Sequence, residues 1–293
     1  MGLLRRSLRY MHNPRDLGDA LAKRTIMLEL AVRNLCSSAA VVSPGSPVVS
    51  LTTYGRRLDT VHFTIESIGR GQLRPSRLIL WIDEVSAFQN LPPALHRLAR
   101  RGLEIRFCRN YGPHKKYYPY VENECSFHDP LVTADDDILY PRRWLNQLFR
   151  AFKEQPRVVN CNYARKLQLN ADGIARFADW EICNTTEPSF SHHAIGMSGV
   201  IYPPAFLDDL KRAGTGFIDC CPRADDIWLH LQAIRAGYKI RQLSTRPSRF
   251  HGIPGTEGSS LWKGNSQGGN DEQAQRAYAA EDILVLEREK SAA

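Results

Sequence analysis

Residues 130–141 read PLVTADDDILYP. The apolar run 130–133 is short, as in a buried strand, and the apolar spacing beyond Pro141 predicts a helix. Between the two stand the three carboxylates of 135–137. The stretch therefore predicts a strand, an acidic turn and a helix.

Three consecutive carboxylates repel one another at neutral pH unless a cation lies among them. On an extended chain Asp135 and Asp137 point to one side and Asp136 to the other. One turn can thus offer oxygen ligands to a hard divalent cation and a further contact to a sugar hydroxyl. The same three aspartates could also belong to a turn that only caps the following helix. The motif alone therefore leaves both the metal site and the helix cap open.

Strands and helices alternate on both sides of this turn. Further strands are predicted at 47–52, 77–82, 103–108, 157–163, 196–202 and 238–243. Helices are predicted at 59–68, at about 93–101, at 204–213 and from 225, and irregular structure at 109–120 and 165–195. Such alternation is typical of an α/β fold with a mostly parallel central sheet flanked by helices, which binds its ligand at the carboxyl ends of the strands.

Composition agrees with a globular protein. The chain has 293 residues, 43% of them hydrophobic, and its 39 Lys and Arg against 31 Asp and Glu give a net charge of +8. These values exclude a collagen-like repeat, wholesale disorder and an integral membrane bundle. We expect a basic N-terminal extension at 1–46 with a helix over 25–35, one main domain at 47–275 and an acidic, helical tail at 276–293.

The basic charge is distributed unevenly. Residues 1–24 hold six Lys and Arg but only two Asp, and no single basic stripe runs through the chain, so we expect no nucleic-acid partner. Neither a signal peptide nor a long apolar run is present, and the seven cysteines form no CxxC pair. We therefore expect a cytoplasmic protein with peripheral contact, through the basic N-terminus, at the inner face of the plasma membrane. The oligomeric state stays open.

Other polar residues follow later strands. Asp225 and Asp226 begin a predicted helix, where the dipole favours ionised carboxylates, and one of them can act as a general base on a hydroxyl. A cap would explain one aspartate but not both. His251, between flexible glycines, is a candidate nitrogen ligand for the acidic turn.

Phosphate chemistry is suggested by the basic and aromatic stretch 109–120, in which Lys115 and Lys116 can neutralise phosphate oxygens. The chain has no GxxxxGK[ST] loop, no strand-linked GxGxxG and no GxSxG elbow. A phosphate would therefore be held through a metal.

Seven strings stand in an order that resembles bacterial family-2-like glycosyltransferases of the GT-A fold, which use nucleotide-sugar donors. The resemblance spans about 47–275. The strings are VVSLTTYGRR, RLILWIDE, NYGPHKKYYPY, LVTADDDILYP, AIGMSGVIYPP, RADDIWL and FHG.

The resemblance implies a donor site for a UDP- or GDP-sugar. The implied base and ribose contacts are Thr52, Thr53, Tyr54, Arg57 and Asp83. Lys115 or Lys116 would lie near the diphosphate. The acidic turn matches the family's DxD motif, so Asp135 and Asp136 would contact the donor, and Asp136, Asp137 and His251 would hold Mn²⁺ or Mg²⁺. Aligning on Pro141 favours Asp136 as the direct ligand, whereas strict DxD spacing favours Asp135 and Asp137.

The resemblance also implies the acceptor side. Asp226 matches the base that deprotonates a hydroxyl of a glycan or glycolipid, and Asp225 would orient that acceptor, which implies inversion of the sugar's anomeric centre. Gly196, Ser198 and Gly199 would form the floor between donor and acceptor, Gly199 in contact with the donor. The stretch 260–271, with Trp262, Asn265 and Asn270, would form a flap over the nucleotide.

Two other classes explain part of the pattern. A metal-dependent nucleotidyltransferase or phosphohydrolase also uses carboxylates and basic residues, although a DxD phosphatase would carry its nucleophile after an early strand. A polyanion-binding scaffold explains the basic N-terminus but not two separate aspartate clusters.

Overall fold

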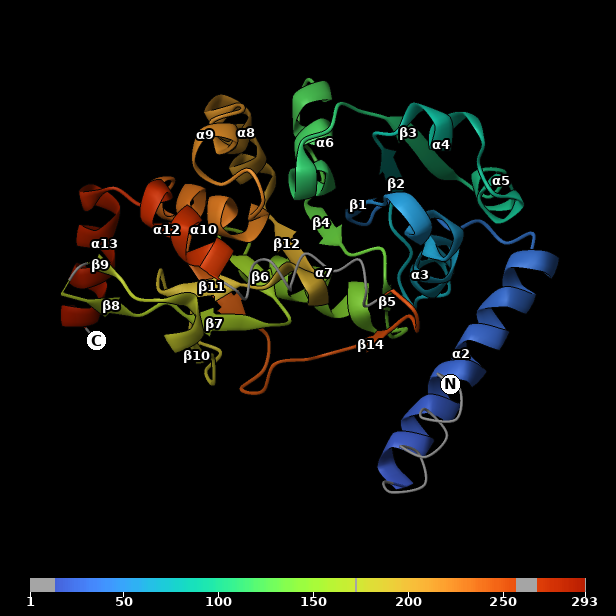
Figure 1. Cartoon of the computed structure of the whole chain (residues 1–293), viewed down its shortest axis with the longest axis horizontal. Helices are drawn as coiled ribbons and strands as arrows, with labels where there is room; N and C mark the ends of the chain where they lie inside the picture. Colours follow the sequence, from blue (N-terminus) through green and yellow to red (C-terminus); the bar gives the residue numbers. More distant parts are fainter. Residues whose placement is uncertain (1–13, 172, 257–267, 293) are drawn as a thin grey trace.

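A computed structural model describes residues 14–171, 173–256 and 268–292. Its centre is a seven-stranded sheet in the order β13-β6-β12-β4-β1-β2-β3, in which only β12 runs antiparallel to its neighbours (Figure 1). The strands are β1 Val48–Thr52, β2 Arg77–Ile82, β3 Leu103–Phe107, β4 Leu131–Ala134, β6 Val159–Cys161, β12 Val200–Tyr202 and β13 Ile240–Gln242. The α/β class with a mostly parallel central sheet is thus confirmed.

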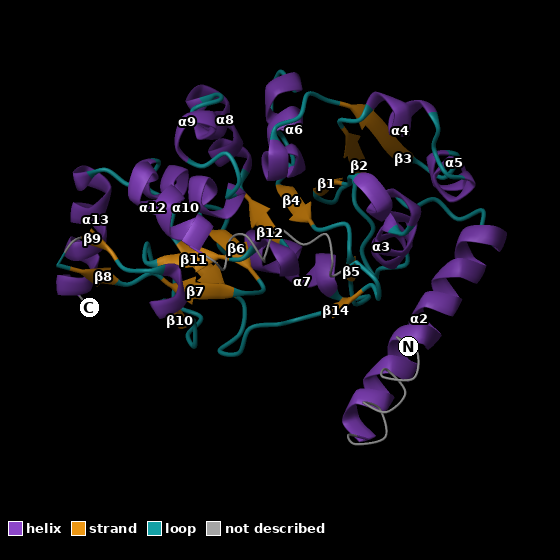
Figure 2. Ribbon diagram, viewed as in Figure 1, coloured by secondary structure: helices purple, strands orange, loops and turns teal. Residues whose placement is uncertain are grey.

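Helices lie on both faces of this sheet (Figure 2). One group is α3 Val61–Gly69, α5 Pro93–Ala99 and α7 Trp144–Glu154, and the other is α6 Tyr118–Asn123, α8 Pro204–Ala213, α10 Asp225–Arg235 and α12 Asn270–Ala277. The remaining helices are α2 Pro14–Cys36, α4 Val85–Gln89, α9 Phe217–Cys220 and α13 Ala280–Ala292, with single turns η1 Gly55–Asp59, η2 Gly112–Lys116, η3 Phe177–Asp179 and η4 Gly196–Ser198.

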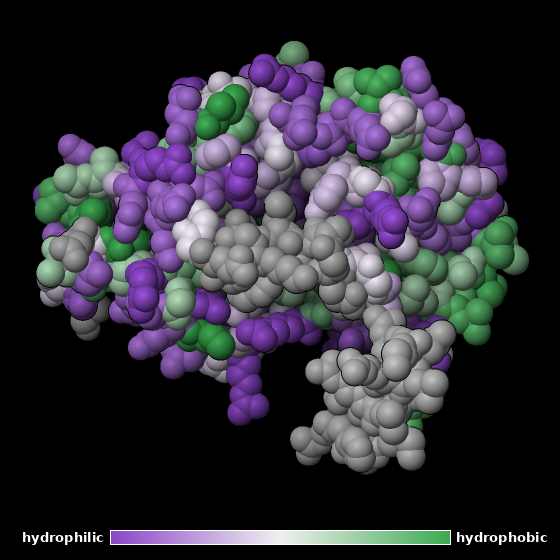
Figure 3. Space-filling model, in the orientation of Figure 1, coloured by the Kyte–Doolittle hydropathy of each residue, from purple (hydrophilic) through white to green (hydrophobic). Residues whose placement is uncertain are grey.

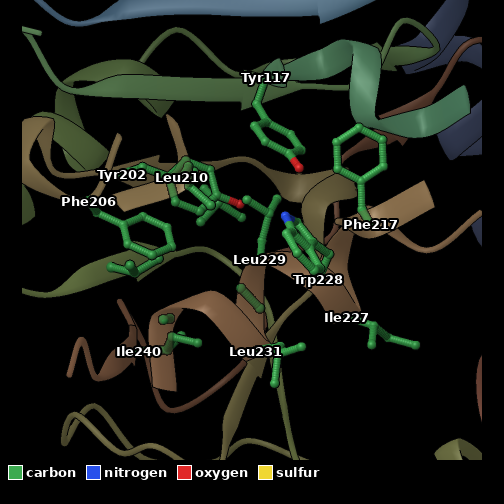
Figure 4. Close-up of a cluster of buried hydrophobic side chains, with 14 of the residues drawn as sticks. Tyr117, Tyr202, Phe206, Leu210, Phe217, Ile227, Trp228, Leu229, Leu231 and Ile240 are labelled. Atoms are coloured by element: carbon green, nitrogen blue, oxygen red, sulfur yellow. The ribbon is translucent and has the colours of Figure 1, made fainter. Parts of the chain in front are cut away.

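Successive side chains along each strand point to opposite faces of the sheet, so the interior contains two hydrophobic cores, one on each face. In β2, Leu78 and Leu80 face α3, α5 and α7, whereas Ile79 and Trp81 face the opposite layer. A strand buried on both faces reads as a continuous apolar run, which is why RLILWI shows no polar alternation. Figure 4 shows the second core, where Trp228 of α10 packs near Tyr117 and Phe217.

The stretch 165–195, predicted as irregular, is the largest departure from the sequence analysis. It contains β7 Ala164–Lys166, β8 Leu169–Asn170, β9 Gly173–Ile174, β10 Glu181–Ile182 and β11 His192–Ala194. Of these, β10, β7 and β11 form a small antiparallel sheet, and β8 pairs with β9. Strands of two or three residues are too short to show a hydrophobic period, so the prediction of irregular structure was wrong here.

Three smaller departures lie around the sheet. The short helices α4 and α9 were not predicted, and the irregular 109–120 contains η2 and the start of α6. The helix expected at 25–35 is the longer α2, which packs on α3 and α5.

Candidate active site

The acidic turn follows β4 at the edge of the sheet where β1 and β2 also end. Asp136 turns inward, since Thr53 donates its Oγ1 hydrogen to Asp136 Oδ2 at 2.7 Å and Arg57 Nη1 lies 2.7 Å from Oδ1. The same guanidinium reaches Asp137 Oδ2 at 3.0 Å. Burial raises the pKa of Asp136, and Arg57 and Thr53 act in the opposite direction. Both oxygens of Asp136 are therefore occupied by protein donors.

Lys116 joins the two aspartate clusters. Its Nζ lies 2.6 Å from Asp135 Oδ1 and 3.5 Å from Asp225 Oδ2. Burial opposes its charge, but the carboxylates of Asp135, Asp225 and Asp226 raise the pKa of Lys116 well above its ordinary value. The lysine is thus a fixed cation, and it brings the end of β4 next to the start of α10 across about ninety residues of sequence.

The neighbouring residues are held in different ways. Lys115 Nζ pairs with Asp83 Oδ1 at 2.5 Å, just beyond the end of β2, and their predicted contacts with the donor stay predictions. The hydroxyl of Thr52 donates to the carbonyl of Trp81 at 3.0 Å and belongs to the sheet. Tyr54 is 39% exposed, and the Arg57 guanidinium carbon lies 5.6 Å from the centroid of its ring.

His114 fixes the lysine-bearing turn η2. Its Nε2 lies 2.7 Å from the carbonyl oxygen of Cys221, and its ring stacks on Phe217 at 3.9 Å. Burial lowers the pKa of His114 to about 4, so the ring is neutral. Through these contacts the neutral His114 ring holds the turn with the two lysines against the loop that leads into α10.

Asp226 accepts a hydrogen bond from the backbone N–H of Gly196 to its Oδ2 at 3.1 Å. Burial and the neighbouring Asp225 raise the pKa of Asp226 to about 8, while Lys116 acts in the opposite direction. The side chain of Asp226 is partly accessible and lines a small cavity. A carboxylate with a raised pKa in a recess has the properties of a general base.

The turn 196–199 lies between the two clusters. The hydroxyl oxygen of Tyr140 accepts a hydrogen bond from the backbone N–H of Asp135 at 2.9 Å. The same hydroxyl donates a hydrogen bond to the carbonyl oxygen of Met197 at 3.2 Å. The indole of Trp144 donates to the carbonyl of Ser198 at 2.9 Å. Gly199 has φ of +90°, and a Cβ there would lie 2.5 Å from Trp144 Nε1, so this position requires glycine. Gly199 lies directly before β12 and beside the end of β4, and its contact with the donor stays a prediction.

Replacing Gly196 with Ala should displace the base without breaking the fold. A Cβ at Gly196 would lie 2.8 Å from Asp226 Oδ1, the end of a movable side chain. We expect kcat to fall by about 10- to 100-fold, because small misplacements of a reacting group are costly. Thermal unfolding of the variant should match the parent. Gly214→Ala is unsuitable as a control because alanine would be strained at its φ of +59°. Gly18→Ala is the matched control, because no atom lies within 4 Å of the added Cβ and its φ is not in the left-handed region. Unchanged kcat in the Gly196 variant would contradict the assignment.

A cavity of about 40 Å³ opens beside Asp226. Its lining residues are Phe177, His193, Ala224, Asp225, Asp226, Ile227 and Asn270. His193 is 1% exposed, and among the described residues neither of its ring nitrogens has a hydrogen-bond partner. In the same part of the chain, Asn270 Oδ1 is also buried and without a partner. Burial holds the pKa of His193 well below its ordinary value, so the ring is neutral. The space holds one to a few small polar groups, and its walls carry free donors and acceptors.

Six carboxylates and three cationic side chains make up this acidic centre. They are Asp83, Asp135, Asp136, Asp137, Asp225 and Asp226 with Arg57, Lys115 and Lys116. Burial, and then the neighbouring carboxylate of Asp135, raise the pKa of Asp137 to about 6. Within 14–171, 173–256 and 268–292, no group of three His, Cys, Asp or Glu side chains is arranged to hold a metal. Mg²⁺ in proteins often takes only one or two carboxylates and completes its shell with phosphate and water.

The structure places the three predicted metal ligands differently. Asp137 is partly exposed, with 19% of its side chain accessible, whereas Asp136 is closed off by Thr53 and Arg57. His251 lies in β14 His251–Gly252, which pairs with β5 Ile138–Leu139 just after the turn. The fold brings His251 to the same region, although not into a three-ligand group with the aspartates. Asp135 and Asp137 are also paired with protein cations, Lys116 and Arg57 respectively, so the identity of the direct ligand stays a prediction.

Some functional groups were not found from the sequence. The role of Arg57 as partner of the acidic turn and the cavity around His193 depend on contacts between distant segments. The adjacent histidines at 192–193 were a visible signal without an assigned role. Trp262 and Asn265 of the predicted flap lie outside the described residues, and Asn270 begins α12 on the cavity wall.

Comparisons with known proteins add little to this picture. No protein-family model and no curated protein matches the chain. Among solved structures it is similar to a CMP:2-keto-3-deoxy-manno-octonic acid synthetase complexed with CTP, with a TM-score of 0.46 and 11% identity over 76% of this chain and 100% of that one. So distant a likeness identifies neither family nor substrate, and the function is argued from the site.

Proposed function

We propose that the protein is a glycosyltransferase that moves a sugar from a nucleotide diphosphate donor to a hydroxyl of a glycan or glycolipid. One observation carries the proposal: a cationic lysine connects an acidic turn to a second aspartate pair whose Asp226 has its pKa raised to about 8. Such a site can hold a charged leaving group on one side and a base on the other.

The donor side is the edge formed by β1, β2 and β4. Tyr54, partly exposed at this edge, would contact the base, and Arg57, Lys115 and Lys116 supply fixed positive charge. Because carboxylates outnumber these cations, a diphosphate would be repelled by the centre without a further cation. Mn²⁺ or Mg²⁺, held by Asp135 and Asp137, would supply Lewis-acid stabilisation of the leaving diphosphate.

The acceptor side is the cavity beside Asp226. An acceptor alcohol placed there can give its proton to the Asp226 carboxylate while its oxygen forms a bond to the anomeric carbon. The bond from that carbon to the diphosphate oxygen breaks, and the diphosphate leaves with the electron pair. His193 and Asn270 provide unpaired polar atoms for a neighbouring hydroxyl of the acceptor, and Phe177 provides an apolar wall. A single displacement of this kind inverts the anomeric centre.

A thermal-shift panel tests the donor. We expect a UDP- or GDP-sugar with Mn²⁺ to raise the midpoint of unfolding, with a much smaller rise for either component alone, because a ligand that binds only the folded state stabilises it. Asp137→Asn should lose the synergy, whereas the exposed control Asp219→Asn should keep it. A shift with CTP and other free nucleoside triphosphates but with no nucleotide sugar would instead favour a nucleotidyltransferase.

A further inference from the structure

We propose that α2 is an interfacial helix that docks the protein on an anionic membrane surface. The large side chains on one of its faces are exposed: Leu17 by 46%, Leu21 by 55%, Leu28 by 67%, Val32 by 52% and Leu35 by 66%. These five make up almost half of the exposed large hydrophobic residues in the described part of the chain. Side chains of this size are normally scattered singly on a surface, so their concentration on one helix is a specific feature.

The spacing places all five on one side of the helix. At 100° per residue, positions 17, 21, 28, 32 and 35 fall within an arc of about 60°. We call this set the leucine stripe. In Figure 3 hydrophobic side chains gather at the edge of the molecule formed by the upper part of α2.

The opposite face of α2 is firmly attached to the domain. Leu30 is fully buried against Leu139 and Ile253. Asn34 Nδ2 donates to Glu66 Oε1 at 3.1 Å, and Arg33 Nε lies 3.2 Å from Glu66 Oε2. These contacts attach the opposite face of α2 to the domain, so the leucine stripe faces away from the domain.

Charge complementarity selects a lipid surface as the occupant. Arg24 is exposed and lies beside the stripe, about 20° outside its arc, and six of the eight charged residues in 1–24 are basic. Glu29, by contrast, is paired with Arg70 and Arg142 of the domain. Anionic headgroups would neutralise this basic charge, whereas a second copy of the same basic segment would add to it.

The helix is suited to lie along a bilayer. Within the described residues no helix is long and apolar enough to cross a membrane. A helix of 23 residues that presents an apolar stripe flanked by basic residues can instead bind in the plane of the interface. The proposal does not depend on the chemistry of the active site.

Vesicle co-sedimentation of the full chain tests the proposal. We expect binding to vesicles of phosphatidylcholine with phosphatidylglycerol, and much weaker binding to phosphatidylcholine alone. The triple variant Leu21→Gln, Leu28→Gln, Leu35→Gln should bind the anionic vesicles at least about tenfold more weakly, because the apolar contribution is lost.

The matched control replaces three exposed residues elsewhere, Ile182→Gln, Ile218→Gln and Leu284→Gln, and should bind like the parent. Equal thermal unfolding of both triple variants will show that the fold is kept. The proposal is wrong if the stripe variant binds as tightly as the parent. It is also wrong if light scattering shows a dimer that the stripe variant alone converts to monomer, since a second copy then covers the stripe.

Discussion

Replacing Asp226 with Asn is expected to reduce sugar transfer by about 10²- to 10⁴-fold, the usual contribution of a positioned general base. Asn keeps the size of the side chain and can still accept the hydrogen bond from the Gly196 N–H at 3.1 Å in the parent. It cannot accept the proton of an acceptor hydroxyl. The loss should appear in kcat, measured by release of the nucleoside diphosphate, with little change in KM for the donor.

The same substitution should make the fold more stable at neutral pH. Burial raises the pKa of Asp226 to about 8, so between its unfolded value and pH 8 the folded chain binds a proton that the unfolded chain has released. Ionisation therefore opposes folding, and the parent loses stability as the pH rises through this window. Asn removes that cost, so the gain in unfolding midpoint should be small near pH 4 and largest near pH 8.

The exposed Asp219→Asn on α9 is the control, because it makes the same chemical change without burial. It should leave both transfer and the pH dependence of stability unaltered. An Asp226 variant that retains transfer would remove the proposed base. An activity loss accompanied by a pH-independent loss of stability would show a structural role only.

Most of the sheet could be predicted because its strands and helices carry strong local signals. The run RLILWI, bounded by polar residues, and the apolar spacing after Pro141 locate β2 and α7 from within short windows. The parallel arrangement then follows from the alternation of strands with helices, and it puts the residues after each strand at one edge.

The pairings inside the site could not be predicted in the same way. Thr53, Arg57 and Asp136 meet across about eighty residues, and nothing local to any of them specifies the other two. The sequence indicated a metal as the counter-ion of the acidic turn, yet the inward carboxylate has a guanidinium partner. Lys116 likewise was expected near phosphate, and its contact with both aspartate clusters depends on the position of η2 beside α10.

Replacing Arg57 with Ala should produce the largest loss of stability among single changes at the site, about 3–5 kcal/mol, because it leaves a buried carboxylate without its cationic partner. Arg57 pairs with Asp136 at 2.7 Å and Asp137 at 3.0 Å, and the side chain of Asp136 is only 4% exposed. Urea unfolding gives the free energy directly. The adjacent Arg56, which is exposed, provides the control Arg56→Ala, expected to change stability by less than about 0.5 kcal/mol.

A double variant separates this charge effect from the loss of side-chain packing. If Arg57→Ala is costly because Asp136 stays charged and buried, then adding Asp136→Asn should recover part of the lost free energy, even though a second native residue has been removed. If the cost came only from lost packing of the long arginine stem, the second substitution would add to the damage. Recovery would therefore establish that Arg57 is the resident counter-ion of Asp136. An additive loss would instead leave this carboxylate available to a metal, as alignment on Pro141 suggests.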